Sequence, residues 1–539
     1  MCPSAAAAFC PSAPACVSRH GRPFGSPPAA PPLPPPAAAP VCGVDPALMK
    51  EYGRHSIKLS RAHEGSGFRV QKVLEKARRG EKIKVAVLGG SGECFGMVVG
   101  SSREGVAGGL GVRQVPPAGV CPLTDELCLT QIFSVSEGHG FKERPNVYGA
   151  IAHDQLWHQL VMQELTRQFG PEAVEFLNGA KAATDSAYFE WCYPAHIGTD
   201  VDLVMIELAV NDDFSTAAFD STEALFRSLL ALPAQPAILL VDAFALVTGR
   251  GKPMQLNGGD AHAHLAVRYD VPHISIRAAA LTAMMADPDL AGPWFNHDAR
   301  HIAAPFHRFL GDMVKAYLQK ELCEVDAGGW DRERQRWGAD ADHPGWPGMQ
   351  TLGQMPKNAI TEPWNSAAKH AVAPPTCRLA GPKNSKAELK PSKPSADWEL
   401  YSWRVSHSPL DWDTLLFRQS WCSPRLLSRP PQYSKYYIQT TKPNSAPISF
   451  AVEVREGSRG EVALGYLRSR EYGLGKARCT VAGQSTVVDG FWTSSTNVAQ
   501  TVVIASKLKP GAYEVECQAL PENEQKDGVG FRIMSLMSV

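Results

Sequence analysis

The sequence predicts an α/β domain with a flavodoxin-like doubly wound parallel sheet, followed by an antiparallel β-sandwich domain. Short aliphatic runs such as VAVL at 85–88 alternate with segments of helical spacing up to about residue 321, which is typical of a parallel sheet covered by helices. From about residue 401, short alternating segments recur between Gly, Pro, Asn and Ser turns, which indicates a sandwich. A chain of 539 residues is also too long for one ordinary core.

The elements of the α/β domain, placed at 45–324, follow from hydrophobic periodicity. Helices are expected over 46–63, 68–79, 147–168, 186–196, 222–231, 259–268 and 303–321. Strands are expected over 83–88, 174–178, 202–210, 237–244 and 273–276. Gly170-Pro171 ends the helix before the second of these strands. Strand and helix therefore alternate, as a doubly wound sheet requires.

The segments outside the α/β domain differ from it in composition. Residues 1–44 are rich in Ala and Pro, cannot bury a core, and are expected to be a disordered tail. Arg19 and Arg22 without an acid before Asp45 also fit a transit peptide, and a mis-assigned start codon is a further alternative. The compartment therefore stays open, with the secretory pathway or an organelle both possible. Residues 325–400 lack periodicity and are expected to be a linker.

The sandwich domain is placed at 401–539. Its predicted strands are PISFAVEV, EVALGYLR, KARCTVA, TVVIAS, AYEVECQ and GFRIMSL. Alternation of apolar with polar residues, clearest in KARCTVA and AYEVECQ, is the pattern of a strand with one buried face.

The composition excludes several classes of function. Lys plus Arg and Asp plus Glu both number 54, and no basic cluster follows a phosphate backbone, so nucleic-acid binding has no support. No apolar run reaches the roughly 18 residues of a transmembrane helix. The 13 cysteines include no C-x-x-C pair, so no metal site is expected, and their odd number says little about redox compartment.

Two sequence blocks suggest nucleophilic chemistry. VAVLGGS delivers Ser91 at the end of a buried strand, where open α/β sheets place their sites. WFNHDARH provides Asp298 and His301 in the spacing Asp-x-x-His, which can supply a base and its orienting carboxylate. These residues predict a Ser/His/Asp hydrolase or acyltransferase. The G-x-S-x-G elbow is absent, which disfavours the α/β-hydrolase fold.

Four blocks occur in a fixed order: GGS with Ser91, NGA with Gly179, ELAVND with Asn211, and DARH with Asp298 and His301. With these blocks, residues 80–321 resemble the SGNH hydrolases, also called the GDSL family. The likeness is greatest to the branch whose first block is GGS, which includes carbohydrate-acting esterases and acyltransferases and which carries a C-terminal β-domain. The resemblance implies the SGNH hydrolase fold.

The resemblance also implies a role for each residue. Ser91 would be the nucleophile, and Asp298 would orient His301 as its base. The backbone N–H groups of Ser91 and Gly179 and the side chain of Asn211 would donate to the oxyanion. In a known oxyanion hole, one such donor is worth about 2.7–4 kcal/mol. Each block also has a structural interpretation, because a tight turn can produce GGS or NGA and a helix cap can produce ND or DARH.

The first block is interrupted. The family motif continues as VSEGHG, which stands here at 135–140, after a Gly-rich segment at 92–134 that we expect to be a disordered insert. Codons for residues 92–94 can contain GTGAGT, a common intron start, and those for 133–135 a common intron end. The insert is therefore a candidate translated intron. Ser134 precedes VSEGHG and is an alternative nucleophile, but KIKVAVL is a better core strand than LCLTQIF, which favours Ser91.

The sequence thus predicts a serine esterase or O-acyltransferase that acts on acyl esters of carbohydrate, with acetyl favoured, through an acyl-serine. Its partner would be a small-molecule or glycan ester, with no cofactor or metal, no nucleic acid and no transmembrane segment. The alternative is a catalytically dead glycan-binding or scaffolding protein, because the nucleophile block is interrupted.

Overall fold

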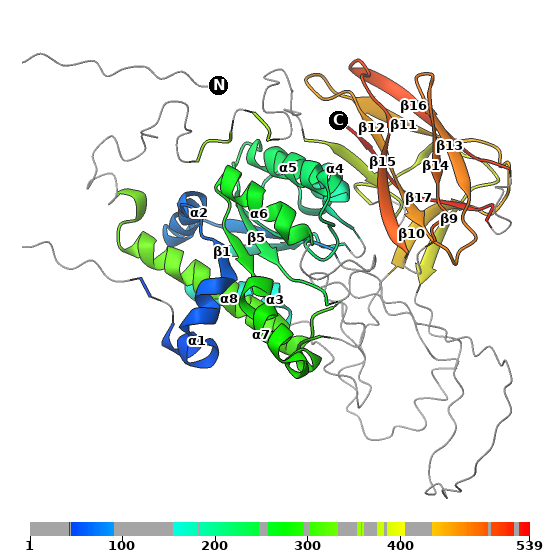
Figure 1. Ribbon diagram of the computed structural model, residues 1–539. Helices are drawn as coiled ribbons and strands as arrows, with labels where there is room; N and C mark the ends of the chain where they lie inside the picture. The colour runs from blue at the N-terminus through cyan, green and yellow to red at the C-terminus, as the bar shows by residue number, and fades with distance from the viewer. Residues whose placement is uncertain are drawn as a thin grey trace, which may run out of the picture. The chain divides into compact units, whose positions relative to one another are not determined.

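The computed structural model describes a helix-covered sheet followed by two antiparallel sheets (Figure 1). The described residues are 42–43, 45–90, 155–181, 184–246, 257–295, 301–331, 353–356, 358–360, 374–381, 385–404, 434–493, 497–521 and 528–539. The predictions of a disordered tail and of an insert at 92–134 fall on residues outside these ranges, except for the last few positions of the tail.

The first sheet has the strand order β1-β6-β5-β4-β2-β3. Its strands are β1 (Arg61–His63), β2 (Ile83–Gly89), β3 (Val174–Asn178), β4 (Leu203–Glu207), β5 (Ala237–Asp242) and β6 (His273–Ser275). All neighbours pair in parallel except β1, which runs antiparallel to β6. Taken in chain order, β2 to β6 are arranged 2-1-3-4-5, the flavodoxin-like order. The predicted doubly wound sheet is therefore present, with an additional antiparallel edge strand.

Alternating residues of the central strands point into two separate cores. Val85 and Val87 of β2 belong to one core, while Ala86 and Leu88 belong to the other. Helices α1 (Pro46–Ser60), α2 (Phe68–Arg78), α3 (Trp157–Phe169), α7 (Ile276–Ala286) and α8 (Ala304–Asp326) contribute to the first core. Helices α4 (Ser186–Ile197), α5 (Thr216–Leu230) and α6 (Gly258–Tyr269) contribute to the second. A sheet buried on both faces explains the continuous apolar runs of the sequence.

Polar side chains fix where several helices begin. The carboxylate of Asp185 accepts the N–H of Tyr188 at the start of α4, and Ser215 caps α5 in the same way. Asn257 and Asp260 form a reciprocal capping box at the start of α6. These caps place the helix N-termini at the carboxyl edge of the sheet, where the candidate site lies.

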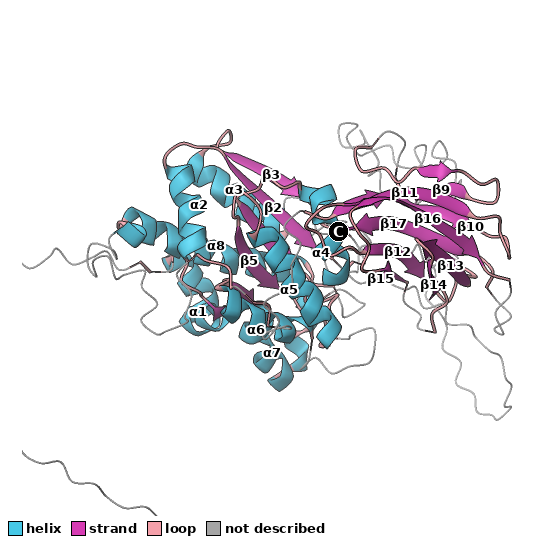
Figure 2. Cartoon of the chain, turned by 90° about the horizontal axis from the view of Figure 1, so that it is seen from above, coloured by secondary structure: helices cyan, strands magenta, loops and turns pink. Residues whose placement is uncertain are grey.

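The C-terminal region consists of two antiparallel sheets (Figure 2). One has the order β15-β12-β17-β10-β9, with β7 also paired to β17, and the other has the order β14-β13-β16-β11-β8. The strands are β7 (Thr376–Leu379), β8 (Pro391–Lys393), β9 (Glu399–Arg404), β10 (Ser434–Thr440), β11 (Ile448–Val454), β12 (Val462–Arg468), β13 (Lys476–Val481), β14 (Gln484–Asp489), β15 (Val498–Ala505), β16 (Gly511–Ala519) and β17 (Phe531–Ser538). Inward-facing residues of both sheets form one core, as a sandwich requires.

Some predicted boundaries were wrong. Strands β7 and β8 and the start of β9 lie inside the expected linker at 325–400 and pair with sandwich strands, so the C-terminal region begins near residue 376. The expected helix over 46–63 ends at Ser60 and is followed by β1. Helix α7 was not expected. Short edge strands with few apolar residues give little periodic signal, which explains why β1, β7 and β8 were missed.

Among the described residues, three disulfides connect positions far apart in the sequence: Cys42–Cys323, Cys192–Cys377 and Cys479–Cys517. Their sequence separations are 281, 185 and 38 residues, so no local spacing motif announced them. Disulfides are typical of proteins that fold in an oxidising compartment.

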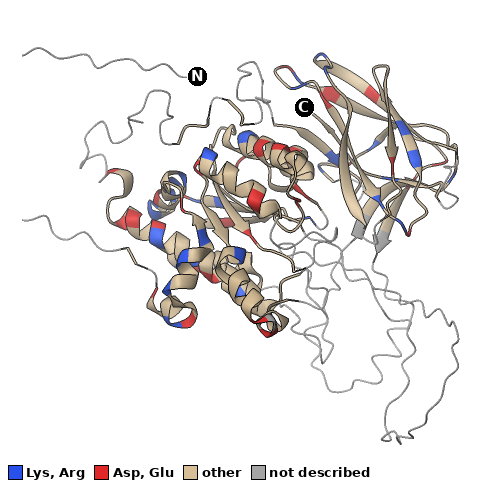
Figure 3. Cartoon of the chain, in the orientation of Figure 1, with Lys and Arg blue, Asp and Glu red and all other residues tan. Residues whose placement is uncertain are grey.

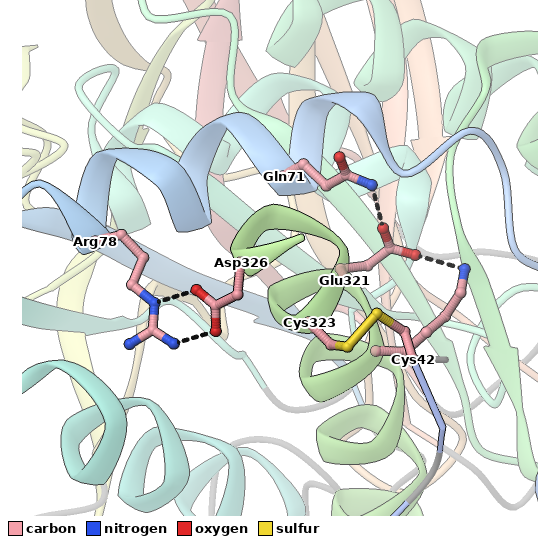
Figure 4. The surroundings of a disulfide bond; sticks show 7 residues. Cys42, Gln71, Arg78, Glu321, Cys323 and Asp326 are labelled. Atoms are coloured by element: carbon pink, nitrogen blue, oxygen red, sulfur yellow. Dashed lines mark hydrogen bonds and ion pairs between the residues drawn. A yellow bond between two sulfur atoms is a disulfide. The ribbon is translucent and has the colours of Figure 1, made fainter. Parts of the chain in front are cut away.

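The first disulfide lies beside a polar cluster on α8 (Figure 4). Glu321 is buried and accepts hydrogen bonds from Gln71 and Lys320 at 2.8 and 2.9 Å. On the same helix, Asp326 makes a two-point contact with Arg78, with nitrogen–oxygen distances of 2.9 and 2.6 Å. The disulfide and these contacts together attach α8 to α2 and to the segment before α1.

Basic and acidic residues are interspersed along the described helices and strands (Figure 3). This mixture matches the zero formal charge of the chain. Within the described ranges, we find no helix with the length and apolar character to cross a membrane.

Candidate active site

The carboxyl ends of β3, β2 and β4 lie side by side and bring three predicted site segments together. Gly90 directly follows β2, Gly179 directly follows β3, and Asn211 lies four residues after β4. Because β2 is the strand at which the winding direction of the sheet reverses, this edge is where open α/β sheets form their binding crevice.

Gly90 packs directly against Asn211. A Cβ atom at position 90 would lie 2.9 Å from Cγ of Asn211 and 1.9 Å from the carbonyl oxygen of Thr184, so only glycine fits here. The Gly90 N–H donates to the carbonyl of Glu207 at 3.2 Å, which joins the ends of β2 and β4. The amide of Asn211 therefore touches the residue that precedes Ser91 in the chain.

Asn211 is held in a tight turn. Its N–H and that of Asp212 both donate to the carbonyl of Leu208, at 3.0 and 2.8 Å. The side-chain Oδ1 of Asn211 is buried and has no hydrogen-bond partner among the described residues. The backbone is thus fixed while Oδ1 is not committed to any described donor.

Gly179 is placed at this edge, but its N–H is already engaged. It donates to the carbonyl of Val87 at 2.9 Å and so extends the parallel ladder between β2 and β3. A Cβ atom at position 179 would lie 2.4 Å from Cγ2 of Ile197, so glycine is required for close packing against the end of α4. Close packing thus accounts for this glycine without a donor role.

His301 is buried at the start of α8, where backbone contacts close the loop that contains the Asp-x-x-His block. Phe295 and Ile302 form an antiparallel bridge, and the Ala303 N–H donates to the carbonyl of Trp294 at 2.8 Å. These backbone contacts fix both ends of the loop. They therefore also fix the backbone position from which the His301 side chain extends.

Aromatic side chains pack together on the described residues that flank this block. The Trp294 and Phe306 rings lie 4.7 Å apart, and the Phe295 and Phe306 rings lie 5.4 Å apart. Phe295 therefore belongs to the core, and Trp294 packs against it. In α8, which begins just after His301, burial lowers the pKa of His307 to about 3, so the His307 imidazole is neutral at physiological pH.

Ser91, Ser134 and Asp298 lie outside the described residues. Of the predicted site, the structure thus places Gly179, Asn211 and His301, together with Gly90 before the candidate nucleophile. No group of three metal-ligating side chains suited to hold an ion occurs in the described ranges.

Sequence reasoning missed a buried polar network directly behind Asn211. Nε2 of His262 lies 2.8 Å from Oδ2 of Asp212, and its Nδ1 lies 3.4 Å from Oδ1 of Asp242. The other oxygen of Asp242 lies 2.6 Å from Nε2 of His273. Burial opposes a charged His262, but hydrogen bonds to Asp212 and Asp242 outweigh it and raise the pKa of His262 to about 10. The one sequence signal of this network was Asp212, an acidic residue that directly follows Asn211 near the end of a strand.

Comparison with solved structures identifies proteins of similar fold. No protein-family model and no curated protein matches the chain. The crystal structure of a two-domain esterase (CEX) active on acetylated mannans, co-crystallised with mannopentaose, is 15% identical with a TM-score of 0.51, and the match covers 89% of this chain and 97% of that one. A second crystal structure of such an esterase is 16% identical with a TM-score of 0.50 and coverages of 89% and 98%. The chain therefore shares this two-domain α/β plus β-sheet fold.

Proposed function

We propose that the protein is a serine esterase or O-acyltransferase of the SGNH type, acting on acyl, and by preference acetyl, esters of carbohydrate. The observation that carries this proposal is the contact between Gly90 and Asn211 at the reversal point of the sheet. It puts a side-chain amide beside the residue that precedes Ser91, where a nucleophile and an oxyanion donor must meet.

The proposed reaction is acyl transfer in two steps. Oγ of Ser91 attacks the ester carbonyl and gives its proton to His301, which Asp298 orients. The tetrahedral intermediate collapses to an acyl-serine, and His301 returns the proton to the departing sugar oxygen. Water or a second sugar hydroxyl then attacks the acyl-serine, and Ser91 recovers its proton. Water gives an esterase, and a sugar hydroxyl gives a transferase.

In this proposal two groups donate to the oxyanion: the N–H of Ser91 and the side-chain amide of Asn211. Gly179 is the third candidate from the family resemblance. Its N–H would have to share or exchange its bond to Val87 to donate to substrate. We therefore expect Asn211 to contribute more to turnover than the backbone at position 179.

The substrate class is supported by the two-domain esterases of similar fold, which are active on acetylated mannans. Their similarity covers both the α/β region and the C-terminal sheets. We extend a carbohydrate ester substrate to this chain on that basis, and leave the sugar and the acceptor to experiment.

The test uses the full chain with p-nitrophenyl acetate, an acetylated mannan and a fluorophosphonate probe. We expect hydrolysis and covalent labelling, both abolished in Ser91→Ala and in His301→Ala. Ser134→Ala is the matched control, because it removes the alternative serine, and it should label as the wild type does. Labelling lost in Ser134→Ala instead would reassign the nucleophile.

A folded wild-type chain that neither labels nor hydrolyses either ester would contradict the proposal. It would support the alternative of a glycan-binding or scaffolding protein. Binding of the same mannan, measured by calorimetry on that inactive chain, would then identify the glycan-binding case.

A further inference from the structure

A chain of buried ionisable side chains runs from Asn211 into the sheet: Asp212, His262, Asp242 and His273. We propose that His262, by bridging Asp212 and Asp242, is a positioning residue that holds the Asn211 amide at the oxyanion site. This inference rests on the proposed esterase or acyltransferase function and adds a residue to which no role was assigned from the sequence.

Asp212 is the junction between the network and the site. It follows Asn211 in the chain, and the two share the turn closed on Leu208. Its Oδ1 accepts the N–H of Ser186 at 2.8 Å, and its carbonyl accepts the N–H of Gly258 at 3.1 Å. The start of α4 and the start of α6 are thus both attached to the residue next to the candidate oxyanion donor.

His262 is a charged bridge. A carboxylate only accepts hydrogen bonds, so an imidazole with a carboxylate at each nitrogen must donate from both and carry a proton on both. The bond to Asp212 is short at 2.8 Å, and the contact with Asp242 is longer at 3.4 Å. A side chain at 262 that cannot donate at both positions would leave at least one buried carboxylate with one partner fewer, which is costly.

The far end of the network is anchored in the sheet. Asp242 is the last residue of β5, and it bonds at 2.6 Å to His273, the first residue of β6. These two strands are adjacent and parallel. The network therefore connects the turn after β4 to the ends of two further strands, which gives Asp212 a rigid support.

The consequence for Asn211 follows from the contact with Gly90. A Cβ atom at position 90 would lie 2.9 Å from Cγ of Asn211, so the Asn211 amide lies close to the end of β2, and a shift of its turn changes that spacing. A displacement of about 1 Å at a reacting site can lower turnover by about 100-fold. Loss of the bridge is therefore expected to lower kcat while substrate binding by the rest of the cleft persists.

The experiment is a double-mutant cycle on the full chain with p-nitrophenyl acetate, with rates normalised to the fraction labelled by the fluorophosphonate. His262→Gln should lower kcat by about 10-fold or more, with KM within about twofold. In the Asn211→Ala background, the same change should lower kcat by less than about twofold, because the residue through which it acts is gone. His273→Gln, further along the network, should show a smaller loss with the same dependence on Asn211.

Glu321→Gln is the matched control. Glu321 is also a buried carboxylate in a hydrogen-bonded cluster, but that cluster shares no residue with the network. We expect its kcat to be unchanged in both backgrounds. Circular dichroism and a thermal melt check folding, and if His262→Gln does not fold, His273→Gln decides.

Equal losses of kcat from His262→Gln or His273→Gln with and without Asn211 would overturn this inference and leave the esterase proposal intact, because the network would then serve stability alone. A wild-type chain without Ser91-dependent turnover would overturn both.

Discussion

Gly90→Ala is the substitution that tests the geometry of the site most directly. The added methyl group would meet the carbonyl oxygen of Thr184 at 1.9 Å, whereas Cβ atoms essentially never come within 3.0 Å of such a neighbour. The end of β2 and the segment with Thr184 must therefore separate by at least about 1.1 Å to relieve the clash. This separation is costly, because the atom that the methyl group meets is a backbone carbonyl oxygen.

Two effects of this separation can be estimated. Overpacking of this kind lowers the free energy of unfolding by about 1–3 kcal/mol. The same displacement changes the distance between residue 91 and the Asn211 amide, and a shift of about 1 Å lowers turnover by about 100-fold. Activity should therefore fall much further than the fraction of folded protein.

The assay is kcat for p-nitrophenyl acetate beside the melting temperature of the same preparation. Gly292→Ala is the control, because a Cβ at that position meets nothing within 4 Å. It should match the wild type in both measurements. Turnover of Gly90→Ala within about twofold of wild type, in a folded protein, would refute the placement of the site at the end of β2.

Two further predictions concern stability. Replacing Cys192 and Cys377 together by Ala opens a loop of 185 residues and should lower the free energy of unfolding by about 5 kcal/mol in the chain-entropy estimate, checked by urea unfolding; a loss under about 1 kcal/mol would contradict it. Burial raises the pKa of Glu190 to about 7, although Arg459 lies nearby. As pH rises from 4.5 through 7, Glu190 ionises more readily in the unfolded chain than in the folded one, so the free energy of unfolding falls. Glu190→Gln should therefore gain on wild type between pH 5 and pH 8, by roughly 3 kcal/mol at most, and an equal melting-temperature difference at both pH values would contradict this.

The parallel sheet could be predicted because its strands are buried on both faces. Every residue of β4 and β5 is buried, and such runs have few alternatives in a soluble chain. The short edge strands could not be predicted in the same way. In β8, for example, Pro391 and Lys393 carry no apolar alternation, and the strand exists only because β11 offers it a partner.

The candidate site also has a part that local sequence predicts and a part that depends on tertiary contacts. Gly179 directly follows β3 and Asn211 lies four residues after β4, so local sequence was sufficient to place them at one edge. The network behind Asn211 depends on tertiary contacts: His262 lies 50 residues from Asp212 and 20 from Asp242. No periodicity connects such residues, because each sits in an element whose own pattern is explained by core packing.

Helix α4 explains why the C-terminal sheets matter to the site. Its first N–H is bonded to Asp212, beside the candidate oxyanion donor. Farther along the helix, Cys192 is joined to Cys377 of β7, and the guanidinium of Arg459 lies 4.7 Å from the ring centre of Trp191. The core of α4, α5 and α6 also includes apolar residues of β7, β12 and β17. Helix α4, which contacts the candidate site through Asp212, is therefore also attached to the C-terminal sheets, and those contacts stabilise its position.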